Sequence, residues 1–279
     1  MTTTAGARMQ GVNHLAFPTF DPVATLRFYR DTLGLPLQQT MQVKAWGPEY
    51  QKDFVHFFFD IGNSDCLAFF YYFGQEPYRD ENLPPLLDLG RHVALHVESA
   101  QMLDEYARRL EEGGYTIDMR VMHETVESVY VRDPNDILVE IARPLRDLGA
   151  ADATDAQVTA WALEQVAGSA DPSLARLWQV KAGLVRDQNG LRPPGDGQVT
   201  VYFLDAAEFA GVASVASQAQ GAEVTRVPGY IAVTSAGPLV IDRRATGVRH
   251  AVWYSCVAAV EGGNVVQFDK DALRVEPGA

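Results

Sequence analysis

The chain carries an internal repeat, and this repeat restricts the fold more than any other feature. In each pass a strand that contains a histidine precedes an amphipathic helix, a glycine stop and three further strand-like segments. The two copies of the repeat are offset by about 78 residues, so that His14-Leu-Ala-Phe aligns with His92-Val-Ala-Leu. A βαβββ unit of this length is too small to bury its own sheet face. The sequence therefore predicts two such units that pair and curl around a shared cleft.

The ends of the predicted helices are marked by ordinary capping residues. Asp21-Pro22 begins the first helix and Gly34 ends it, whereas Ser99 begins the second helix and Gly113 ends it. Past Pro144 the pattern changes, and small polar residues at 146–155 are typical of a linker. The remaining segment predicts an α+β domain at residues 156–279. We expect its elements to be helices at 156–166, 172–185 and 206–219, strands at 199–204, 223–232 and 238–243, and a closing hairpin formed by 249–260 and 263–275.

Composition excludes several classes of partner. The 279 residues include 23 basic and 36 acidic side chains, for a formal net charge of −13, and supply no basic stripe for nucleic acid or an anionic membrane. Cys66 and Cys256 have neither a disulfide pattern nor metal-ligand spacing. The first ten residues lack the apolar run of a secretory signal, and no run of about 18 apolar residues follows. We expect a cytoplasmic protein.

The segment from Val121 to Glu140 predicts a β-hairpin that contains chemically useful side chains. An Asp133-Pro134 turn separates two apolar runs, and alternation along the second run places Leu138 and Glu140 on one face and Val139 on the other. An ionised carboxylate is costly to bury alone. Glu140 therefore requires a cation, a hydrogen-bonding partner or open water.

Three residues occupy corresponding places in the repeat and suggest a metal site. His14 and His92 begin equivalent strands, and Glu140 lies in the last strand of the second unit. Two imidazoles and one carboxylate with open neighbouring positions form the ligand set of non-haem Fe(II) oxygen chemistry. Taken singly, a strand histidine is more often a core or rim residue. We predict that the trio binds a metal ion.

The first 145 residues resemble the vicinal oxygen chelate superfamily, which includes glyoxalase I, extradiol ring-cleaving dioxygenases, fosfomycin-resistance thiol transferases and bleomycin-binding proteins. The resemblance is carried by GVNHLAF, FYRDTLGL, RHVALHV and DPNDILVEI. It implies an α+β fold in which modules 8–80 and 88–145 form one domain, 8–145, with a curled mixed sheet around a metal cleft. His123, Tyr130, Asp133-Pro134 and Glu140 also follow the signature of the type I extradiol dioxygenases, except that Asp136 stands where that pattern has Gly or Pro. Asn and Asp tolerate the backbone angles of such a turn.

This resemblance implies roles for individual residues. His14, His92 and Glu140 would be the metal ligands, with Fe(II) as the expected ion and Mn(II) or another divalent metal as the alternative. His123 and Tyr130 would be the catalytic residues and act on a small aromatic or diol substrate that chelates the metal. We expect a homodimer. One departure concerns the acid–base histidine that such enzymes carry some fifteen residues before His92, because this chain has Glu76-Pro77-Tyr78 there. His56 and His96 are the other histidines of this half.

Three alternatives share the same fold. Glyoxalase I would require an acid at Ala68 or Phe69, and the chain has none there. Fosfomycin-type thiol transferases use the same two-histidine, one-glutamate set, so the ligands alone do not determine the reaction. A metal-free protein that binds an aromatic small molecule would need only the aromatic stretch between Trp46 and Tyr78, half of which alternation would place in the cleft.

Overall fold

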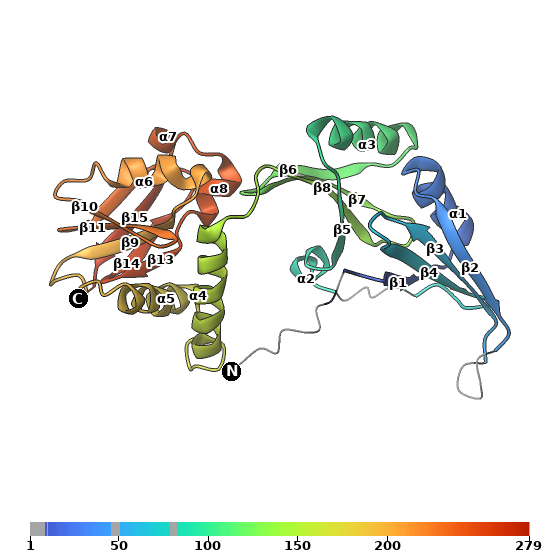
Figure 1. The fold of residues 1–279 in the computed structure, drawn as a ribbon, viewed down its shortest axis with the longest axis horizontal. Coiled ribbons are helices and arrows are strands. Elements are labelled where there is room, and N and C mark those ends of the chain that lie inside the picture. Colours follow the sequence, from blue (N-terminus) through green and yellow to red (C-terminus); the bar gives the residue numbers. More distant parts are fainter. Residues whose placement is uncertain (1–8, 10, 46–50, 79–82, 279) are drawn as a thin grey trace. The chain divides into compact units, whose positions relative to one another are not determined.

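The computed structural model describes residues 9, 11–45, 51–78 and 83–278, and its fold is the predicted α+β class (Figure 1). The contacts divide the chain into two compact units, each described by itself below. Unit 1 comprises Met1–Val121 and Val126–Pro144, and unit 2 comprises Met122–Thr125 and Leu145–Ala279. None of the helices within the described residues has the length and apolar character needed to cross a bilayer.

The first module of unit 1 has the predicted βαβββ order. β1 (His14–Pro18) is followed by α1 (Pro22–Leu26), the π-helical η1 (Arg27–Thr32), β2 (Leu37–Val43), β3 (Phe54–Asp60) and β4 (Cys66–Tyr72). Asp21 caps α1 by accepting a hydrogen bond from the Ala24 N–H at 2.9 Å. The sheet order is β1-β4-β3-β2, with β1 parallel to β4 and the other pairs antiparallel.

The second module repeats this topology, which confirms the predicted repeat. A short helix α2 (Pro85–Leu89) precedes β5 (His92–His96), α3 (Ala100–Glu112), β6 (Ile117–Met122), β7 (Val126–Arg132) and β8 (Leu138–Pro144). The sheet order is β5-β8-β7-β6, and β5 runs parallel to β8 as β1 does to β4. β7 and β8 form the predicted hairpin, and Asp136 in its turn has a φ of 69°. Asp136 therefore has a left-handed backbone conformation, which Asp tolerates better than most residues do.

The two modules of unit 1 share one apolar core on the helix side of their sheets. Alternate strand residues such as Phe57, Phe69 and Val139 point into this core, where they meet Phe28 of η1 and Leu110 of α3. The other face of each sheet carries the intervening residues, and we call it the site face. Its members include His14, His56, Phe58 and Phe70 in the first module and His92, Ser128, Tyr130 and Glu140 in the second.

Unit 2 combines helices with two antiparallel sheets. Its helices are α4 (Ala150–Val166), α5 (Leu174–Gln188), η2 (Ala207–Phe209), α6 (Ala210–Ala216), α7 (Arg243–Thr246) and α8 (His250–Ser255). Its strands are β9 (Val199–Leu204), β10 (Glu223–Val227), β11 (Tyr230–Ser235), β12 (Leu239–Asp242), β13 (Ala259–Glu261), β14 (Gly263–Phe268) and β15 (Ala272–Pro277). The sheet orders are β10-β11-β9-β13 and β12-β15-β14.

Several sequence predictions for this half were wrong in detail. Residues 263–275, predicted as one arm of the closing hairpin, contain both β14 and most of β15. Much of the predicted linker 146–155 is helical, because α4 already begins at Ala150, where the Asp152 carboxylate accepts from the Gly149 N–H at 2.7 Å. Residues 223–232 hold a turn between β10 and β11 rather than one strand. The segment after Arg249 is the helix α8 rather than a strand. Trp253 is fully buried there, and its indole N–H donates to the Asp269 carbonyl at 2.6 Å, a tertiary contact that local sequence does not reveal.

Candidate metal and substrate site

His92 and Glu140 form the centre of the candidate site. They lie on the neighbouring parallel strands β5 and β8, where Glu140 pairs in register with Ala94, and both side chains project from the site face. His92 Nε2 lies 3.0 Å from Glu140 Oε2. The Glu140 side chain is 7% exposed and the His92 side chain 33% exposed, so the pair is reached from the His92 side. The requirement for a partner at Glu140, inferred from the sequence, is met by this histidine.

The hydrogen bond of His92 Nδ1 determines what can lie between His92 Nε2 and the Glu140 carboxylate. His92 Nδ1 is 2.9 Å from the carbonyl oxygen of Leu89, which can only accept, so Nδ1 carries a proton. Nε2 then faces a carboxylate oxygen, which is also an acceptor, and a proton or a cation must lie between them. Two donor atoms that bind one cation at about 2.1 Å and at right angles are about 3.0 Å apart. The pair therefore fits a divalent metal ion as well as it fits a protonated histidine.

Two further side chains of the site face surround Glu140. Tyr130 of β7 stands in register with Glu140, and Ser128 donates its hydroxyl to Glu140 Oε1. The Tyr130 ring lies edge-on to His92 with 6.0 Å between ring centroids. Burial, reinforced by the negative charge of Glu140 and a hydrogen bond to it, raises the pKa of Tyr130 to about 12. The site thus contains a phenol that keeps its proton at neutral pH.

His14, the third predicted ligand, is not brought to this pair within one chain. It lies exposed on β1, where its Nδ1 is 2.7 Å from Asn13 Oδ1 and its ring contacts His56 and Phe58. Among the described residues, no group of three or more His, Cys, Asp or Glu side chains is arranged to hold a metal ion. The His92–Glu140 half of the set is assembled, and the complete three-ligand set stays a prediction.

Aromatic side chains cover the site face of the first module. The buried His56 ring stacks on Phe70 with 3.6 Å between centroids and 6° between planes, and Phe70 in turn stacks on Tyr72. His56 Nδ1 lies 3.0 Å from the Phe69 carbonyl, and burial lowers the pKa of His56. The predicted aromatic lining is present here, whereas Trp46 and Tyr50 lie outside the described residues.

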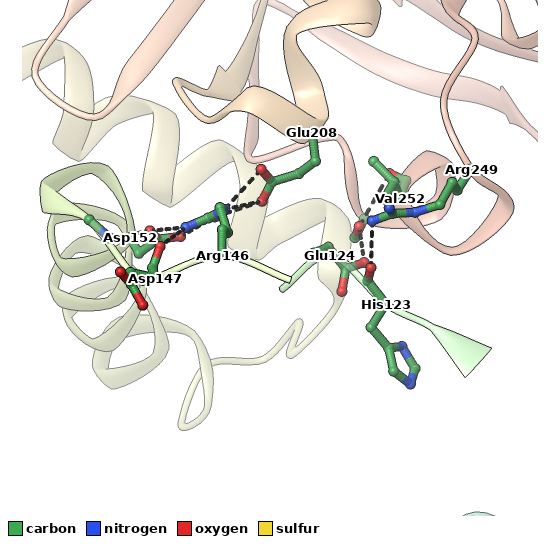
Figure 2. Close-up of polar contacts among 10 residues, drawn as sticks. His123, Glu124, Arg146, Asp147, Asp152, Glu208, Arg249 and Val252 are labelled. Carbon is green, nitrogen blue, oxygen red and sulfur yellow. Dashed lines mark hydrogen bonds and ion pairs between the residues drawn. The ribbon is translucent and has the colours of Figure 1, made fainter. Parts of the chain in front are cut away.

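The remaining histidines of the first half lie in different surroundings. His96 pairs with Ala142, beyond the Ala94–Glu140 pair, and lines a cavity of about 60 Å³ together with Leu33 and Ile61. His123 lies in the segment Met122–Thr125, which groups with unit 2. Its backbone carbonyl accepts a hydrogen bond from Arg249 Nη2 at 2.8 Å (Figure 2). A catalytic role for the His123 side chain stays a prediction.

Sequence reasoning missed Ser128, although a signal was available. Residues two apart in a strand share a face, and Ser128 precedes Tyr130 by two positions opposite the strand of Glu140. The sequence analysis gave Ala68 or Phe69 as the place where a fourth ligand is absent. Ala68 pairs with Ala16 as Glu140 pairs with Ala94, so this alanine occupies the position in the first module that Glu140 occupies in the second.

Comparison with known proteins agrees with the fold and the resemblance. Residues 11–141, just under half of the chain, match the Glyoxalase/Bleomycin resistance protein/Dioxygenase superfamily. The match supports the resemblance of residues 11–141 to that superfamily, and the paired βαβββ modules agree with it. No curated protein matches the chain.

Several solved structures match about half of the chain. A glyoxalase family protein from Bacillus cereus is 18% identical, covers 52% of this chain and 100% of its own length, and has a TM-score of 0.42. A glyoxylase/bleomycin resistance protein/dioxygenase domain from Frankia sp. EAN1pec is 20% identical, with coverages of 49% and 99% and a TM-score of 0.39. Lactoylglutathione lyase from Agrobacterium tumefaciens is 21% identical, with coverages of 49% and 95% and a TM-score of 0.34.

Proposed function

We propose that this chain is a divalent-metal enzyme of the extradiol-dioxygenase type, which cleaves a catechol-like aromatic diol with O₂. The observation that carries the proposal is the His92–Glu140 pair, with 3.0 Å between Nε2 and Oε2, beside the protonated phenol of Tyr130. His92, Glu140 and His14 would hold the metal ion, which we expect to be Fe(II), with Mn(II) as the alternative. When bound, the ion lowers the pKa of the diol oxygens, and Fe(II) also supplies the redox chemistry for O₂.

The surrounding residues position the ligands before substrate arrives. The Leu89 carbonyl holds His92 in the tautomer whose Nε2 lone pair faces the metal position. Ser128 occupies one oxygen of Glu140, which leaves the other oxygen directed at His92. Partners of this kind keep ligand side chains in one rotamer, so that less order is lost when the metal binds.

Tyr130 is the acid–base group of the proposed reaction. Its hydroxyl hydrogen-bonds the same carboxylate that would hold the metal, so it lies within reach of a substrate oxygen on that metal. Tyr130 would donate a proton or a hydrogen bond to that oxygen. His123 would hydrogen-bond the substrate. The stacked rings of His56 and Phe70 form a flat surface against which an aromatic ring can pack.

Metal analysis and oxygen uptake test this proposal together. Protein purified without oxygen should contain nearly stoichiometric iron and consume O₂ when catechols are added. Glu140→Gln should lose most of the iron, because it removes the ligand charge while it keeps the side-chain shape, whereas the exposed Glu76→Gln is the matched control.

The other outcomes point to the remaining members of the superfamily. Bound manganese, nickel or zinc without O₂ consumption would contradict the dioxygenase and indicate a glyoxalase, isomerase or thiol-transferase reaction at the same site. If neither protein binds metal after reconstitution, and both bind aromatic ligands equally, the chain is a metal-free binding protein and the proposal is wrong.

A further inference from the structure

We propose that the ion pair between Asp88 and Arg132 positions the metal ligand His92 through the short helix α2. Both residues act through the Leu89 carbonyl, so they are positioning residues and not catalytic ones. The inference rests on the proposed function, since His92 is a ligand only if a metal ion binds there. It goes further by naming the residues that fix the group by which this ligand is oriented.

The oxygen that orients His92 belongs to the end of α2. Leu89 is the last residue of this helix, and Gly90 and Arg91 lead from it to His92 in β5 (Figure 1). Carbonyls in the last turn of a helix lack partners within the helix. The Leu89 oxygen is therefore available to His92 Nδ1, 2.9 Å away. Any shift of α2 moves the acceptor that holds the imidazole.

Apolar packing does little to hold α2 in place. None of its 5 residues is buried, and Leu86 is 82% exposed. Most helices in proteins are stabilised by burial of one apolar face against the core, and an isolated helix of this length would not persist in water. Polar contacts must therefore fix the position of α2.

Arg132 of β7 provides such a contact. Its Nη2 lies 2.5 Å from Asp88 Oδ2 and its Nη1 lies 3.4 Å from Asp88 Oδ1, so the guanidinium meets the carboxylate with two nitrogens. The same guanidinium is also bound to the sheet, because Nη1 donates to the Asp136 carbonyl at 2.9 Å and Nε lies 3.8 Å from Asp118 Oδ2. A guanidinium held at several of its atoms gives Asp88 a defined partner.

The sheet register places Arg132 in the same row as the ligand. Arg132 pairs with Leu138, and Leu138 pairs with His92, so these three residues form one row across β7, β8 and β5. Two consecutive residues of α2 are bound to the outer members of that row, Asp88 to Arg132 and Leu89 to His92. Loss of the first contact should therefore loosen the second.

The exposure of the ion pair limits the size of the effect. The Arg132 and Asp88 side chains are 31% and 36% exposed, so water and salt screen the attraction between them. We therefore expect loss of the pair to lower metal affinity about 3- to 10-fold, which is less than the loss of a ligand would cause.

Zinc affinity and hydrogen exchange test the inference on the full chain. Asp88→Ala should lower the affinity for Zn²⁺, measured by competition with a chelator, about 3- to 10-fold. It should also speed amide exchange across residues 84–92 of the metal-free protein, measured by mass spectrometry. Asp205→Ala, which breaks an exposed ion pair with Arg226 in unit 2, is the control and should change neither quantity.

A double-substitution cycle shows whether Asp88 and Arg132 act as one unit. Arg132→Ala should lose at least as much zinc affinity as Asp88→Ala, and the addition of Asp88→Ala to it should cause no further loss. Asp88→Glu keeps the charge and should recover part of the affinity.

The Nδ1 proton of His92 gives a signature that a general loss of stability would not give. Zn²⁺ is diamagnetic, so nuclear magnetic resonance of the zinc-loaded protein with isotope-labelled histidine can detect this proton, and His92→Gln identifies its signal. The proton should exchange slowly with water in the wild type and faster in Asp88→Ala. The signal of His250 in unit 2 should stay unchanged.

Faster amide exchange at α2, weaker zinc binding and faster exchange of the Nδ1 proton would together support the inference. If any one of these three quantities is unchanged in Asp88→Ala, the positioning role is wrong while the metal site stands. If the wild type binds neither Zn²⁺ nor Fe(II), the proposed function is wrong and the positioning of a metal ligand is wrong with it.

Discussion

Tyr29 and Asp133, 104 residues apart in the chain, are joined by a buried hydrogen bond in which the tyrosine hydroxyl donates to Asp133 Oδ2 at 3.0 Å. Tyr29 belongs to η1 of the first module, and Asp133 opens the β7–β8 turn of the second. Burial, and then the charge of Asp133, raises the pKa of Tyr29 well above its ordinary value. The bond therefore persists at all pH values near neutrality and connects the two modules.

Removal of this hydroxyl should destabilise unit 1. Tyr29→Phe leaves the buried Asp133 without one of its donors, and we expect a loss of about 1–3 kcal/mol in the free energy of unfolding. Urea unfolding followed by circular dichroism measures the change. Tyr78→Phe, at a side chain that is 72% exposed, is the control and should change little. Equal effects of the two substitutions would contradict the role of the Tyr29–Asp133 bond.

Ser128 should act through Glu140 rather than on substrate. Ser128→Ala removes the hydroxyl that donates to Glu140 Oε1, so the carboxylate loses the contact that fixes its orientation. We expect metal affinity to fall about 10- to 100-fold, as is typical when a group that orients a ligand is removed. Competition with a metal chelator measures this affinity. Ser235→Ala, a buried serine of unit 2, should leave it unchanged, and an unaltered affinity in Ser128→Ala would exclude the positioning role.

Tyr130 should affect turnover and leave metal binding intact. Tyr130→Phe keeps the ring that lies against His92 and removes only the hydroxyl proton. If Tyr130 is the acid–base group, turnover should fall about 10²- to 10⁴-fold. Steady-state oxygen uptake and metal analysis on the same preparation separate the two effects. Full turnover in the variant would remove Tyr130 from the mechanism, and lost metal would show that its role is structural.

The ion pairs of Arg146 at the start of unit 2 should make the stability of this unit depend on pH in the acidic range. Arg146 donates to Asp152 and to Glu208, with distances of 2.7 Å and 2.6 Å for the closest pairs (Figure 2). These hydrogen bonds to Arg146 lower the pKa of Asp152 to about 2. Because the folded pKa lies below the unfolded value of 3.8, the contribution of Asp152 to stability is fully present above pH 3.8 and is lost as pH falls towards 2.

Asp152→Asn should therefore lower stability at neutral pH by an amount on the order of 1–2 kcal/mol and flatten the decline between pH 4 and pH 2. Tryptophan fluorescence reports mainly on unit 2, because Trp161, Trp178 and Trp253 all lie there. Asp171→Asn, at an exposed residue, is the control. An unfolding curve with the wild-type pH dependence would show that the Arg146 cluster does not contribute.

The hydrogen bond from Arg249 should restrain the loop that contains His123. Arg249 Nη2 donates to the His123 carbonyl at 2.8 Å (Figure 2). Ser255 donates to the Glu124 carboxylate. Arg249→Ala removes the first of these bonds, and we expect faster hydrogen exchange across residues 120–127, measured by mass spectrometry. Arg244→Ala, an exposed arginine of α7, should leave the exchange unchanged. Unchanged exchange in Arg249→Ala would show that this bond does not restrain the loop.

Local signals in the sequence were sufficient for much of unit 1. Asp21 and Ser99 begin helices as predicted, because capping depends on a side chain and the backbone three residues away. The alternation around Glu140 gave the correct faces of β8, since the pleat of a strand fixes them. The closing segment of unit 2 was mispredicted because the environment of Trp253 is created by residues of other elements.

The sequence by itself determined that Glu140 needs a partner, because a carboxylate placed among apolar strand residues cannot remain buried alone. Only the tertiary structure decided that His92 and Ser128 provide it, through the pairing of β8 with β5 on one side and β7 on the other. The repeat likewise placed His14 and His92 in equivalent strands. The packing of the modules through their helices, which no local pattern encodes, decided that these histidines do not meet within one chain.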